Sequence, residues 1–226
     1  LVREAAGRGA TYVQTPEMTG LIQKNRPTLL EEISPEAEDP IAATASSLAK
    51  DLGIWLHVGS TPIALGDGKV ANRAFLFAPD GGKRVSYDKI HMFDVDLDNG
   101  ESWRESAVYQ PGDSAVTVQM DDALVGLAIC YDVRFPQLYR DLARARPDVR
   151  LIAIPAAFTV PTGPELLFRM SALTYNTHRI HYDLPYVTGV EGYPGLVVHG
   201  QQGTAVHAVP PIRPAALSIT ARIVSG

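Results

Sequence analysis

Cysteine is nearly absent from this chain, because Cys130 is the only one among 226 residues. A single cysteine can form neither an internal disulfide nor a cysteine-rich zinc site, and the six histidines show no metal-ligand spacing. We therefore assign no metal and no cofactor. The lack of disulfide-forming cysteines favours a reducing compartment, and we predict a cytoplasmic location.

Blocks of positive charge and long apolar runs are also missing. The formal net charge is -5 and no lysine- or arginine-rich block is present, so the chain lacks the electrostatic pattern of a nucleic-acid-binding protein. No apolar run reaches the ~18 residues that would indicate a membrane span. A hydrophobic content of 46% and a charged content of 20% are typical of a globular domain, so we expect neither nucleic-acid nor membrane partners.

The length fits one large domain or two small ones with a real hydrophobic core. The chain starts at Leu1 instead of methionine, and residues 1–6 resemble the second half of a helix that ends at Gly7 and Gly9. We therefore expect a truncated N-terminus.

Short apolar runs alternate with helical patterns along the chain, which predicts an α/β (α+β) fold with helices packed on a mixed sheet. The predicted helices cover 40–52, 135–144 and 165–177. The predicted strands cover 10–15, 55–60, 69–78, 84–88, 115–118, 124–129, 151–156, 195–199, 204–208 and 216–223. Two hairpins are expected, at 69–88 and 195–208, and residues 89–110 are expected to form a long loop, which is usually functional or disordered.

Three reactive side chains follow predicted strands: Glu17, Lys89 and Cys130. Side chains at the carboxyl ends of strands face the crevice in which α/β sheets bind ligands. There, Glu17 could take the proton of the Cys130 thiol, and Lys89 could stabilise the thiolate and an oxyanion. Each residue also has a simpler interpretation, since glutamate and lysine at strand ends are usually solvated and a lone cysteine is usually a small apolar filler.

Together these motifs resemble the nitrilase superfamily of carbon–nitrogen hydrolases, which is marked by a Glu-Lys-Cys triad in this order. The resemblance covers roughly residues 1–163 and is carried by segments 10–17, 87–96, 126–136 and 155–159. Segments 104–106 and 111–113 are most similar to the deaminated-glutathione amidase and ω-amidase branch.

The resemblance implies a role for each matching residue. Glu17 would be the general base, Lys89 the catalytic lysine and Cys130 the nucleophile. Glu105, six residues before Pro111, matches a second family glutamate, although it could be a solvated loop residue and Glu101 is a weaker rival. The backbone N–H of Tyr131 resembles an oxyanion donor, and Phe158 in the strand-end motif is assigned to substrate binding.

Arg134 and His91 leave two interpretations open. Arg134 could bind a substrate carboxylate through two hydrogen bonds, or it could form a structural ion pair with Asp132 or another carboxylate. His91 lies within the lysine motif, but the mechanism needs no histidine, so we interpret it as structural. The triad cysteine is expected to react rapidly with electrophiles near neutral pH, because its thiolate would be favoured.

The resemblance implies a four-layer α-β-β-α sandwich, a single domain over residues 1–226, and a homodimer or larger homo-oligomer. It also implies cysteine-dependent hydrolysis of a small linear amide, carrying a carboxylate, to a carboxylic acid and ammonia. Residues 164–192 diverge from the family pattern: they lack its tryptophan, and Asn176 follows tyrosine where the family has glutamate. Gln137 also replaces a usual glutamate. Two alternatives are a catalytically inactive binding or oligomerisation module and a true nitrilase.

Overall fold

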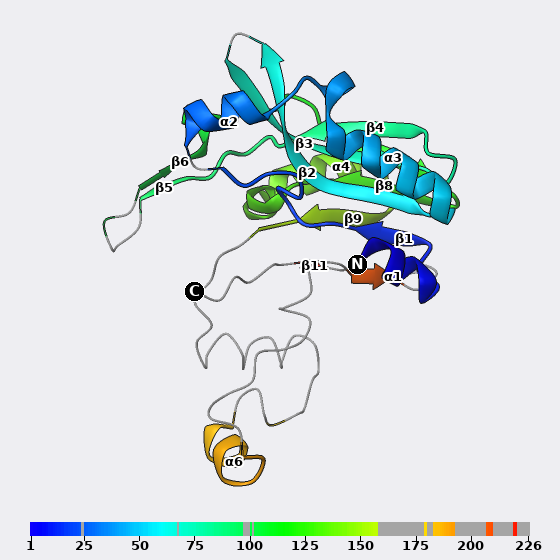
Figure 1. Cartoon of the computed structure of the whole chain (residues 1–226), viewed down its shortest axis with the longest axis vertical. Coiled ribbons are helices and arrows are strands. Elements are labelled where there is room, and N and C mark those ends of the chain that lie inside the picture. The colour runs from blue at the N-terminus through cyan, green and yellow to red at the C-terminus, as the bar shows by residue number, and fades with distance from the viewer. Residues whose placement is uncertain are drawn as a thin grey trace. The chain divides into compact units, whose positions relative to one another are not determined.

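The computed structural model describes residues 1–23, 25–66, 68–96, 100, 102–157, 179, 183–192, 207–209 and 219–220 (Figure 1). Its α-helices are α1 (Val2–Gly7), α2 (Arg26–Glu32), α3 (Pro40–Leu52), α4 (Pro136–Ala145) and α6 (Leu184–Gly189). Its strands are β1 (Tyr12–Gln14), β2 (Trp55–Gly66), β3 (Lys69–Phe77), β4 (Lys83–Asp88), β5 (Asp94–Asp96), β6 (Ser102–Arg104), β7 (Val116–Met120), β8 (Ala123–Leu127), β9 (Val149–Pro155), β10 (His207–Val209) and β11 (Ile219–Thr220). The described residues also include the short 3-10 helices η1 (Glu36–Glu38), η2 (Glu105–Ala107) and η3 (Cys130–Arg134).

One sheet has the strand order β10-β1-β2-β3-β4. Strands β1 and β2 are parallel, with Tyr12 opposite Trp55, whereas β2, β3 and β4 are antiparallel neighbours. A parallel pair requires a crossover connection, and α2 and α3 lie in the one between β1 and β2. The segment that leaves β1 therefore runs beside β2, where it carries Glu17.

Helix α3 covers this sheet, and its sequence fixes both of its ends. The Asp39 carboxylate accepts a hydrogen bond from the Ala42 backbone N–H at 2.6 Å, and Pro40 occupies the first turn. Gly53 ends the helix with a φ of 62°, which glycine adopts readily. Burial of one face places the helix on the sheet, through a core cluster that includes Ala45, Ala49, Leu56, Val58, Phe75 and Phe77.

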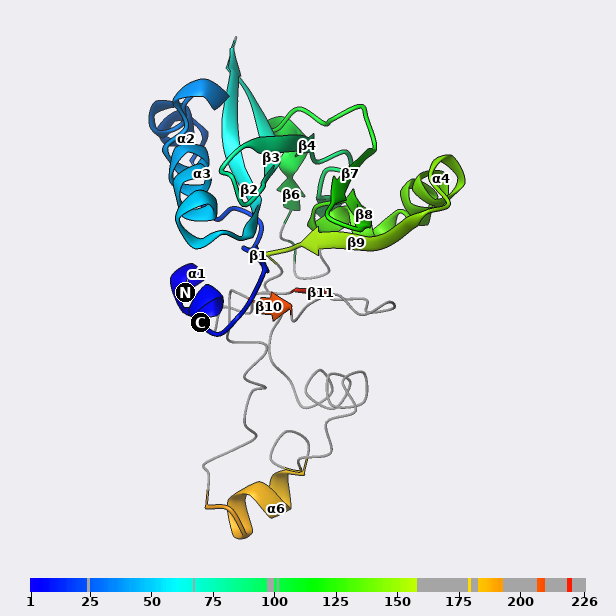
Figure 2. The same ribbon diagram turned by 90° about the vertical axis from the view of Figure 1, so that its right-hand side faces the viewer.

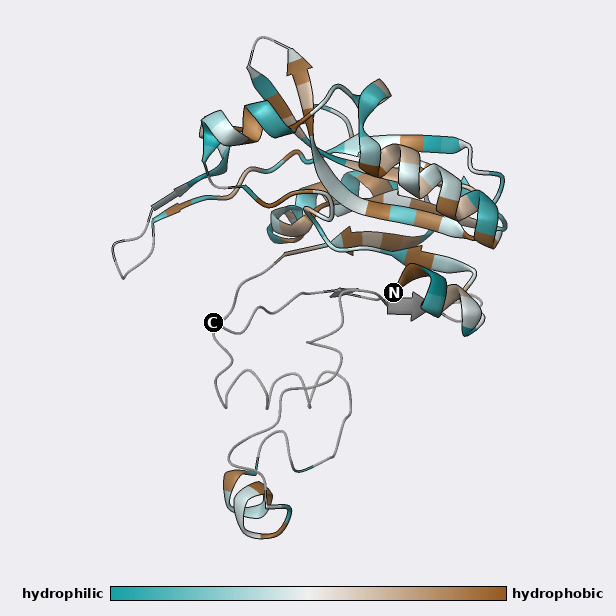
Figure 3. Ribbon diagram, in the orientation of Figure 1, coloured by the Kyte–Doolittle hydropathy of each residue, from teal (hydrophilic) through white to brown (hydrophobic). Residues whose placement is uncertain are grey.

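A second sheet has the order β11-β9-β8-β7. Strands β8 and β9 are parallel and are connected through α4, whose Leu138 and Leu142 pack with Ala128 and Ile154. Figure 3 shows β9 drawn mostly in the colours of apolar residues. In Figure 2, α3 and α4 lie on opposite sides of the two sheets.

The chain divides into two compact units. One contains Leu1–Ala157 and Val206–Thr220, and the other contains Phe158–Ala205 and Ala221–Gly226. Every element named above except α6 belongs to the first unit. Within the described ranges, no helix is long and apolar enough to cross a membrane.

Several predicted elements are confirmed. The helix over 40–52 has the expected bounds in α3, and β3 and β4 form the first predicted hairpin. The stretch 89–110 is not a bare loop, because it contains the β5–β6 hairpin and η2. Helix α2 was not predicted, although Asn25 caps it and Pro27 stands in its first turn.

Other predictions need correction or fall on residues that the structure does not describe. The strand predicted over 124–129 ends at Leu127, because the chain turns before it reaches Cys130. From the second predicted hairpin, the structure describes β10, and it pairs with β1. The predicted helix at 165–177 and the predicted strand at 195–199 lie outside the described residues, as does most of the divergent segment 164–192.

Candidate active site

Glu17 lies in a tight loop that β2 holds in place. The backbone N–H of Gly59 donates to the Thr15 hydroxyl at 3.0 Å, and the Met18 N–H donates to the Ser60 hydroxyl at 2.9 Å. A Cβ at Gly59 would lie only 2.1 Å from the Thr15 carbonyl oxygen, so glycine permits this close approach. Met18 has a φ of 55°, which turns the chain directly after Glu17. These contacts fix the direction of the Glu17 side chain.

Lys89 follows the last residue of β4 directly, as predicted. Its N–H donates to the Asn72 carbonyl at 2.9 Å, and its carbonyl accepts from the Gly112 N–H at 2.8 Å. A Cβ at Gly112 would lie 2.4 Å from the Asp88 carbonyl oxygen. A second glycine therefore permits the close packing that holds the lysine backbone.

Cys130 is the first residue of η3 and has a φ of 46°. Left-handed backbone is unfavourable for residues other than glycine, asparagine and aspartate, and at functional sites it marks a position that the surrounding structure enforces. The nucleophile candidate thus sits on a sharp turn after β8, not at the end of an extended strand.

Asp132 fixes this turn. It is fully buried, and its two carboxylate oxygens accept four hydrogen bonds: from Tyr87 Oη (2.7 Å), the Ile129 N–H (2.8 Å), the His91 N–H (2.9 Å) and His91 Nδ1 (2.7 Å). The His91 ring also stacks on Phe135 at 3.8 Å between centroids. Asp132 therefore joins the cysteine turn to the lysine segment, and these contacts support the structural interpretation of His91.

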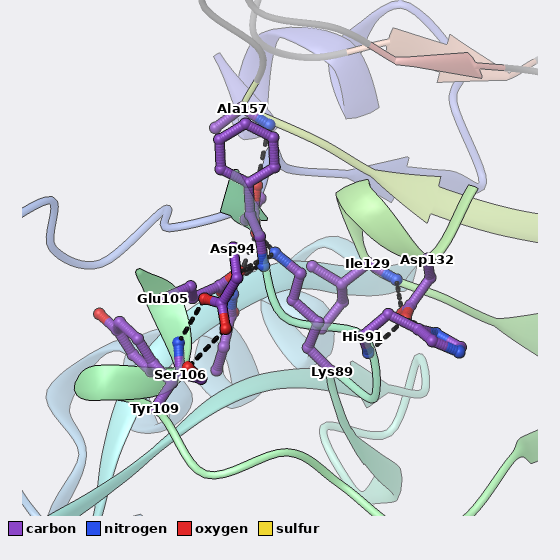
Figure 4. Close-up of polar contacts among 12 residues, drawn as sticks. Lys89, His91, Asp94, Glu105, Ser106, Tyr109, Ile129, Asp132 and Ala157 are labelled. Carbon is purple, nitrogen blue, oxygen red and sulfur yellow. Dashed lines mark hydrogen bonds and ion pairs between the residues drawn. The ribbon is translucent and has the colours of Figure 1, made fainter. Parts of the chain in front are cut away.

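Lys89 connects two carboxylates in a buried ionic cluster. Its Nζ lies 3.0 Å from Glu17 Oε1, and 3.0 and 2.8 Å from Glu105 Oε1 and Oε2. Glu105 Oε2 also accepts the Phe93 N–H at 2.7 Å. The side chain of Lys89 is 2% exposed, that of Glu17 7% and that of Glu105 12%, so water screens these charges little. Figure 4 shows Lys89 reaching toward Glu105, and Asp132 between Ile129 and His91.

The structure thus brings Glu105 into the cluster and excludes the solvated interpretation of this residue. The rival Glu101 lies outside the described residues. Burial by itself lowers the pKa of Lys89, but the charges of Glu17 and Glu105 outweigh it and raise the pKa above its ordinary value. Lys89 therefore stays protonated and acts as a fixed positive charge.

The Cys130 thiol lies against the same cluster. Glu17 and Lys89 are close enough to shift the pKa of this thiol, and the backbone N–H of Ala157 donates to Glu17 Oε2 at 3.1 Å. Burial raises the pKa of Cys130, and the charge of Glu17 raises it further, more than Lys89 lowers it. The expectation of a preformed thiolate was therefore wrong: the resting group is a thiol, and a base must take its proton.

Asn72 was missed in the sequence. It is completely buried on β3, and its Nδ2 donates to Glu17 Oε1 at 3.0 Å and to Glu105 Oε1 at 3.2 Å. The available signal was weak: an asparagine beside Arg73 in a predicted strand whose other members are mostly apolar. Tyr109 was missed as well; burial raises the pKa of its hydroxyl, and the nearby charges of Glu105 and Glu17 add to this shift.

The residues predicted to bind substrate do not take part in the ionic cluster as the structure describes it. Tyr131 is half-buried and makes edge contacts with Phe93 and Phe135, at 5.0 and 5.4 Å between ring centroids. Arg134 is exposed, and the described residues contain no ion pair between it and Asp132, whose oxygens are occupied by other donors. Phe158 lies outside the described residues.

No group of three or more histidine, cysteine, aspartate or glutamate residues that could hold a metal ion occurs in the part of the chain that the structure describes. The ionic cluster instead has the composition of an acid–base and nucleophile site. A carboxylate forms an ion pair with a protonated amine, and both lie close enough to a thiol to shift its pKa.

Comparisons with known proteins identify the family of this chain. The family model of carbon-nitrogen hydrolases matches residues 1–174. Deaminated glutathione amidase from Yersinia enterocolitica is 34% identical over 171 residues, which cover 73% of this chain and 59% of that protein. Omega-amidase NIT2 from Mus musculus is 38% identical over 178 residues, which cover 76% of this chain and 62% of that protein.

Solved structures show the same fold. An amidase from Nesterenkonia sp. shares 26% sequence identity at a TM-score of 0.58, over 70% of this chain and 56% of that one. At 25% identity and a TM-score of 0.58, a variant of the Nesterenkonia amidase carries the acetamide moiety of fluoroacetamide at its active-site cysteine, over 76% of this chain and 62% of that one. The chain spans less than two thirds of the length of these relatives. By the family match and by these relatives, the chain belongs to the carbon–nitrogen hydrolases of the nitrilase superfamily.

Proposed function

We propose that this protein hydrolyses a small linear amide to a carboxylic acid and ammonia through a thioester on Cys130. The observation that supports this most is the buried cluster in which Lys89 joins Glu17 to Glu105, with the Cys130 thiol near enough for Glu17 and Lys89 to act on its pKa. The covalent adduct on the active-site cysteine of the Nesterenkonia amidase variant supports the nucleophile assignment.

In the first step, Glu17 takes the thiol proton as the sulfur attacks the amide carbonyl carbon. A base is required because the pKa of the thiol is raised by burial. Lys89 holds the resulting oxyanion with its charge and does not give up a proton, since its pKa is raised by the two carboxylates. The N–H of Tyr131 serves as the second oxyanion donor.

In the next steps, Glu17 returns the proton to the amide nitrogen, the C–N bond breaks, and ammonia leaves a thioester. Water then attacks the thioester carbon while Glu17 takes a proton from it. The C–S bond breaks, and Glu17 returns this proton to the sulfur, so the carboxylic acid leaves and the resting thiol is restored. Glu105 assists by keeping Lys89 in place.

We infer a carboxylate-bearing substrate from Arg134. This guanidinium is exposed four residues past Cys130, and relatives include an omega-amidase and a deaminated glutathione amidase. A charge-assisted bidentate contact contributes roughly 1.5–3 kcal/mol, so Arg134→Lys should lower kcat/KM about 10- to 150-fold for an acidic amide. The loss for a neutral amide of equal length should be much smaller, and equal losses would make Arg134 structural. We also propose that Phe158 binds the substrate.

We also infer that the family domain extends over residues 1–226 as a four-layer α-β-β-α sandwich that forms a homodimer or a larger homo-oligomer. The position of α3 and α4 on opposite sides of the two sheets supports this layering. Light scattering coupled to size-exclusion chromatography tests the assembly, and a monomer at micromolar concentration would contradict it.

The decisive experiment combines acid quenching with intact-mass spectrometry during turnover of a short amide. The expected result is an acyl adduct on Cys130 and its absence in Cys130→Ala, which should remain folded and inactive. Near-wild-type turnover by Cys130→Ala would disprove the mechanism.

A matched nitrile, assayed in parallel, distinguishes the amidase from a true nitrilase. A folded wild type that shows neither adduct nor turnover would indicate an inactive binding module.

A further inference from the structure

Asn72 contacts both buried glutamates through a single atom. Its Nδ2 donates to Glu17 Oε1 and to Glu105 Oε1, and these contacts use both amide hydrogens. Asn72 lies on β3 with no exposed surface, so water does not compete for these bonds. The same two oxygens also accept from Lys89 Nζ.

The orientation of the amide follows from its partners. Carboxylate oxygens only accept, so the NH2 group must face them, and rotating the amide would place its oxygen against two acceptors. In this orientation Asn72 Oδ1 is buried without a hydrogen-bond partner among the described residues. A buried unpaired acceptor is unfavourable, so the two bonds to the glutamates must outweigh its cost.

Counting acceptor positions separates the roles of the two glutamates. A carboxylate offers about four positions, two on each oxygen. All those of Glu105 are filled, by Lys89 and Asn72 on Oε1 and by Lys89 and the Phe93 N–H on Oε2. Glu17 Oε1 is filled by Lys89 and Asn72, whereas the Ala157 N–H is the only backbone or nitrogen donor of the described residues that Oε2 accepts.

We propose that Asn72 is a positioning residue that keeps Glu105 and Glu17 Oε1 free of protons and so directs the proton of Cys130 to Glu17 Oε2. This inference rests on the proposed function, in which Glu17 is the base. Without the two N–H bonds, Glu17 Oε1 and Glu105 Oε1 would each have a vacant acceptor position, where a proton would compete with the transfer from Cys130 to Glu17 Oε2.

Asn72→Asp tests this because it replaces the double donor with a third carboxylate of nearly equal size. The other titratable groups that face Glu17 are Lys89, Glu105, Cys130 and the Tyr109 hydroxyl. Lys89 stays protonated and Tyr109 stays neutral near pH 7, since the pKa of each is raised. Three carboxylates around one lysine should retain a proton to higher pH.

The experiment measures two pH profiles for wild type and variant: kcat/KM for the amide, and the rate of Cys130 alkylation by iodoacetamide. Alkylation is unambiguous because the chain has one cysteine. For Asn72→Asp, kcat/KM at pH 7 should fall about 100-fold, and the acid limb of both profiles should move up by about one pH unit or more. Asn25→Asp is the matched control, because aspartate caps α2 as well as asparagine does, and its profiles should match wild type.

An acid limb that stays in place, or a loss of kcat/KM below threefold, would overturn the proposal. Asn72→Ser keeps one donor and provides the answer if Asn72→Asp does not fold: a smaller upward shift supports the proposal and no shift overturns it. If wild type hydrolyses no amide, the proposed function fails, while the alkylation profiles still decide the role of Asn72.

Discussion

The cluster around Lys89 and the cluster around His57 are both buried beside strands β1–β3, but the first is ionic and the second is neutral. Lys89 contacts Glu17 and Glu105 within hydrogen-bond distance. His57 Nδ1 instead lies 2.9 Å from the Tyr12 hydroxyl, which donates to Gln14 Oε1 at 2.9 Å.

Burial lowers the pKa of both His57 and Lys89, but the final pKa is lowered only for His57. The Tyr12 hydroxyl donates its hydrogen bond to Gln14, so His57 Nδ1 must be the donor in its contact with the Tyr12 oxygen. His57 Nε2 has no hydrogen-bond partner within the described ranges. A proton there would create an uncompensated buried charge, and burial lowers the pKa of His57 to about 4. At Lys89, two anions reverse the effect of burial. Of these two clusters, only the one that contains opposite charges holds a buried cation.

The largest expected effect comes from removing the positive charge of the ionic cluster. Lys89→Met should lower kcat/KM by at least about 100- to 1000-fold, because an oxyanion donor is lost. It should also lower the free energy of unfolding at pH 7 by about 3–5 kcal/mol, because two buried carboxylates lose their cation. Urea unfolding measures the second effect.

The exposed Lys50→Met is the matched control and should stay within about 0.5 kcal/mol of wild type. The loss in Lys89→Met should shrink at low pH, where protons neutralise the carboxylates. A loss below 1 kcal/mol at pH 7 would mean that Lys89 does not hold the cluster together.

The next largest effect concerns the neutral cluster: we expect buried His57 to make the free energy of unfolding depend on pH. Between about pH 6.5 and 4, unfolded His57 binds a proton and folded His57 does not, so stability falls as pH falls through this window. A shift from 6.5 to about 4 corresponds to on the order of 3 kcal/mol. His57→Gln should flatten the unfolding free energy across this window, as measured by urea titrations at several pH values. An equally steep dependence in the variant would assign it to other groups.

The sequence predicted the parts of the site that depend on local patterns. Glu17, Lys89 and Cys130 each follow a strand and stand in family motifs, and the structure brings them together. Asn72 could not be found in this way, because its contact with both glutamates depends on the pairing of β3 with its neighbours.

The two wrong predictions, an extended strand up to Cys130 and a favoured thiolate, also failed because they depend on contacts between residues distant in the sequence. The turn at Cys130 is enforced by the four hydrogen bonds of Asp132, two of which come from His91, 41 residues earlier in the chain. The protonation of the thiol depends on burial and on Glu17, neither of which can be read from the cysteine motif. Helix α2 could have been predicted from its Asn25 cap and Pro27, since these signals are local.

The smallest expected effect isolates one hydrogen bond of the neutral cluster. Tyr12→Phe removes a hydroxyl that connects His57 to Gln14 and leaves both of these buried groups unpaired, which should cost about 1–3 kcal/mol of unfolding free energy. Tyr139→Phe is the matched control: its hydroxyl is buried without a hydrogen-bond partner among the described residues, so its removal should be neutral or slightly stabilising. Urea unfolding at pH 7 measures both. Because neither tyrosine contacts the ionic cluster, kcat/KM should stay within about twofold of wild type. Equal stability changes in the two variants would show that the neutral cluster is held by packing and not by its hydrogen bonds.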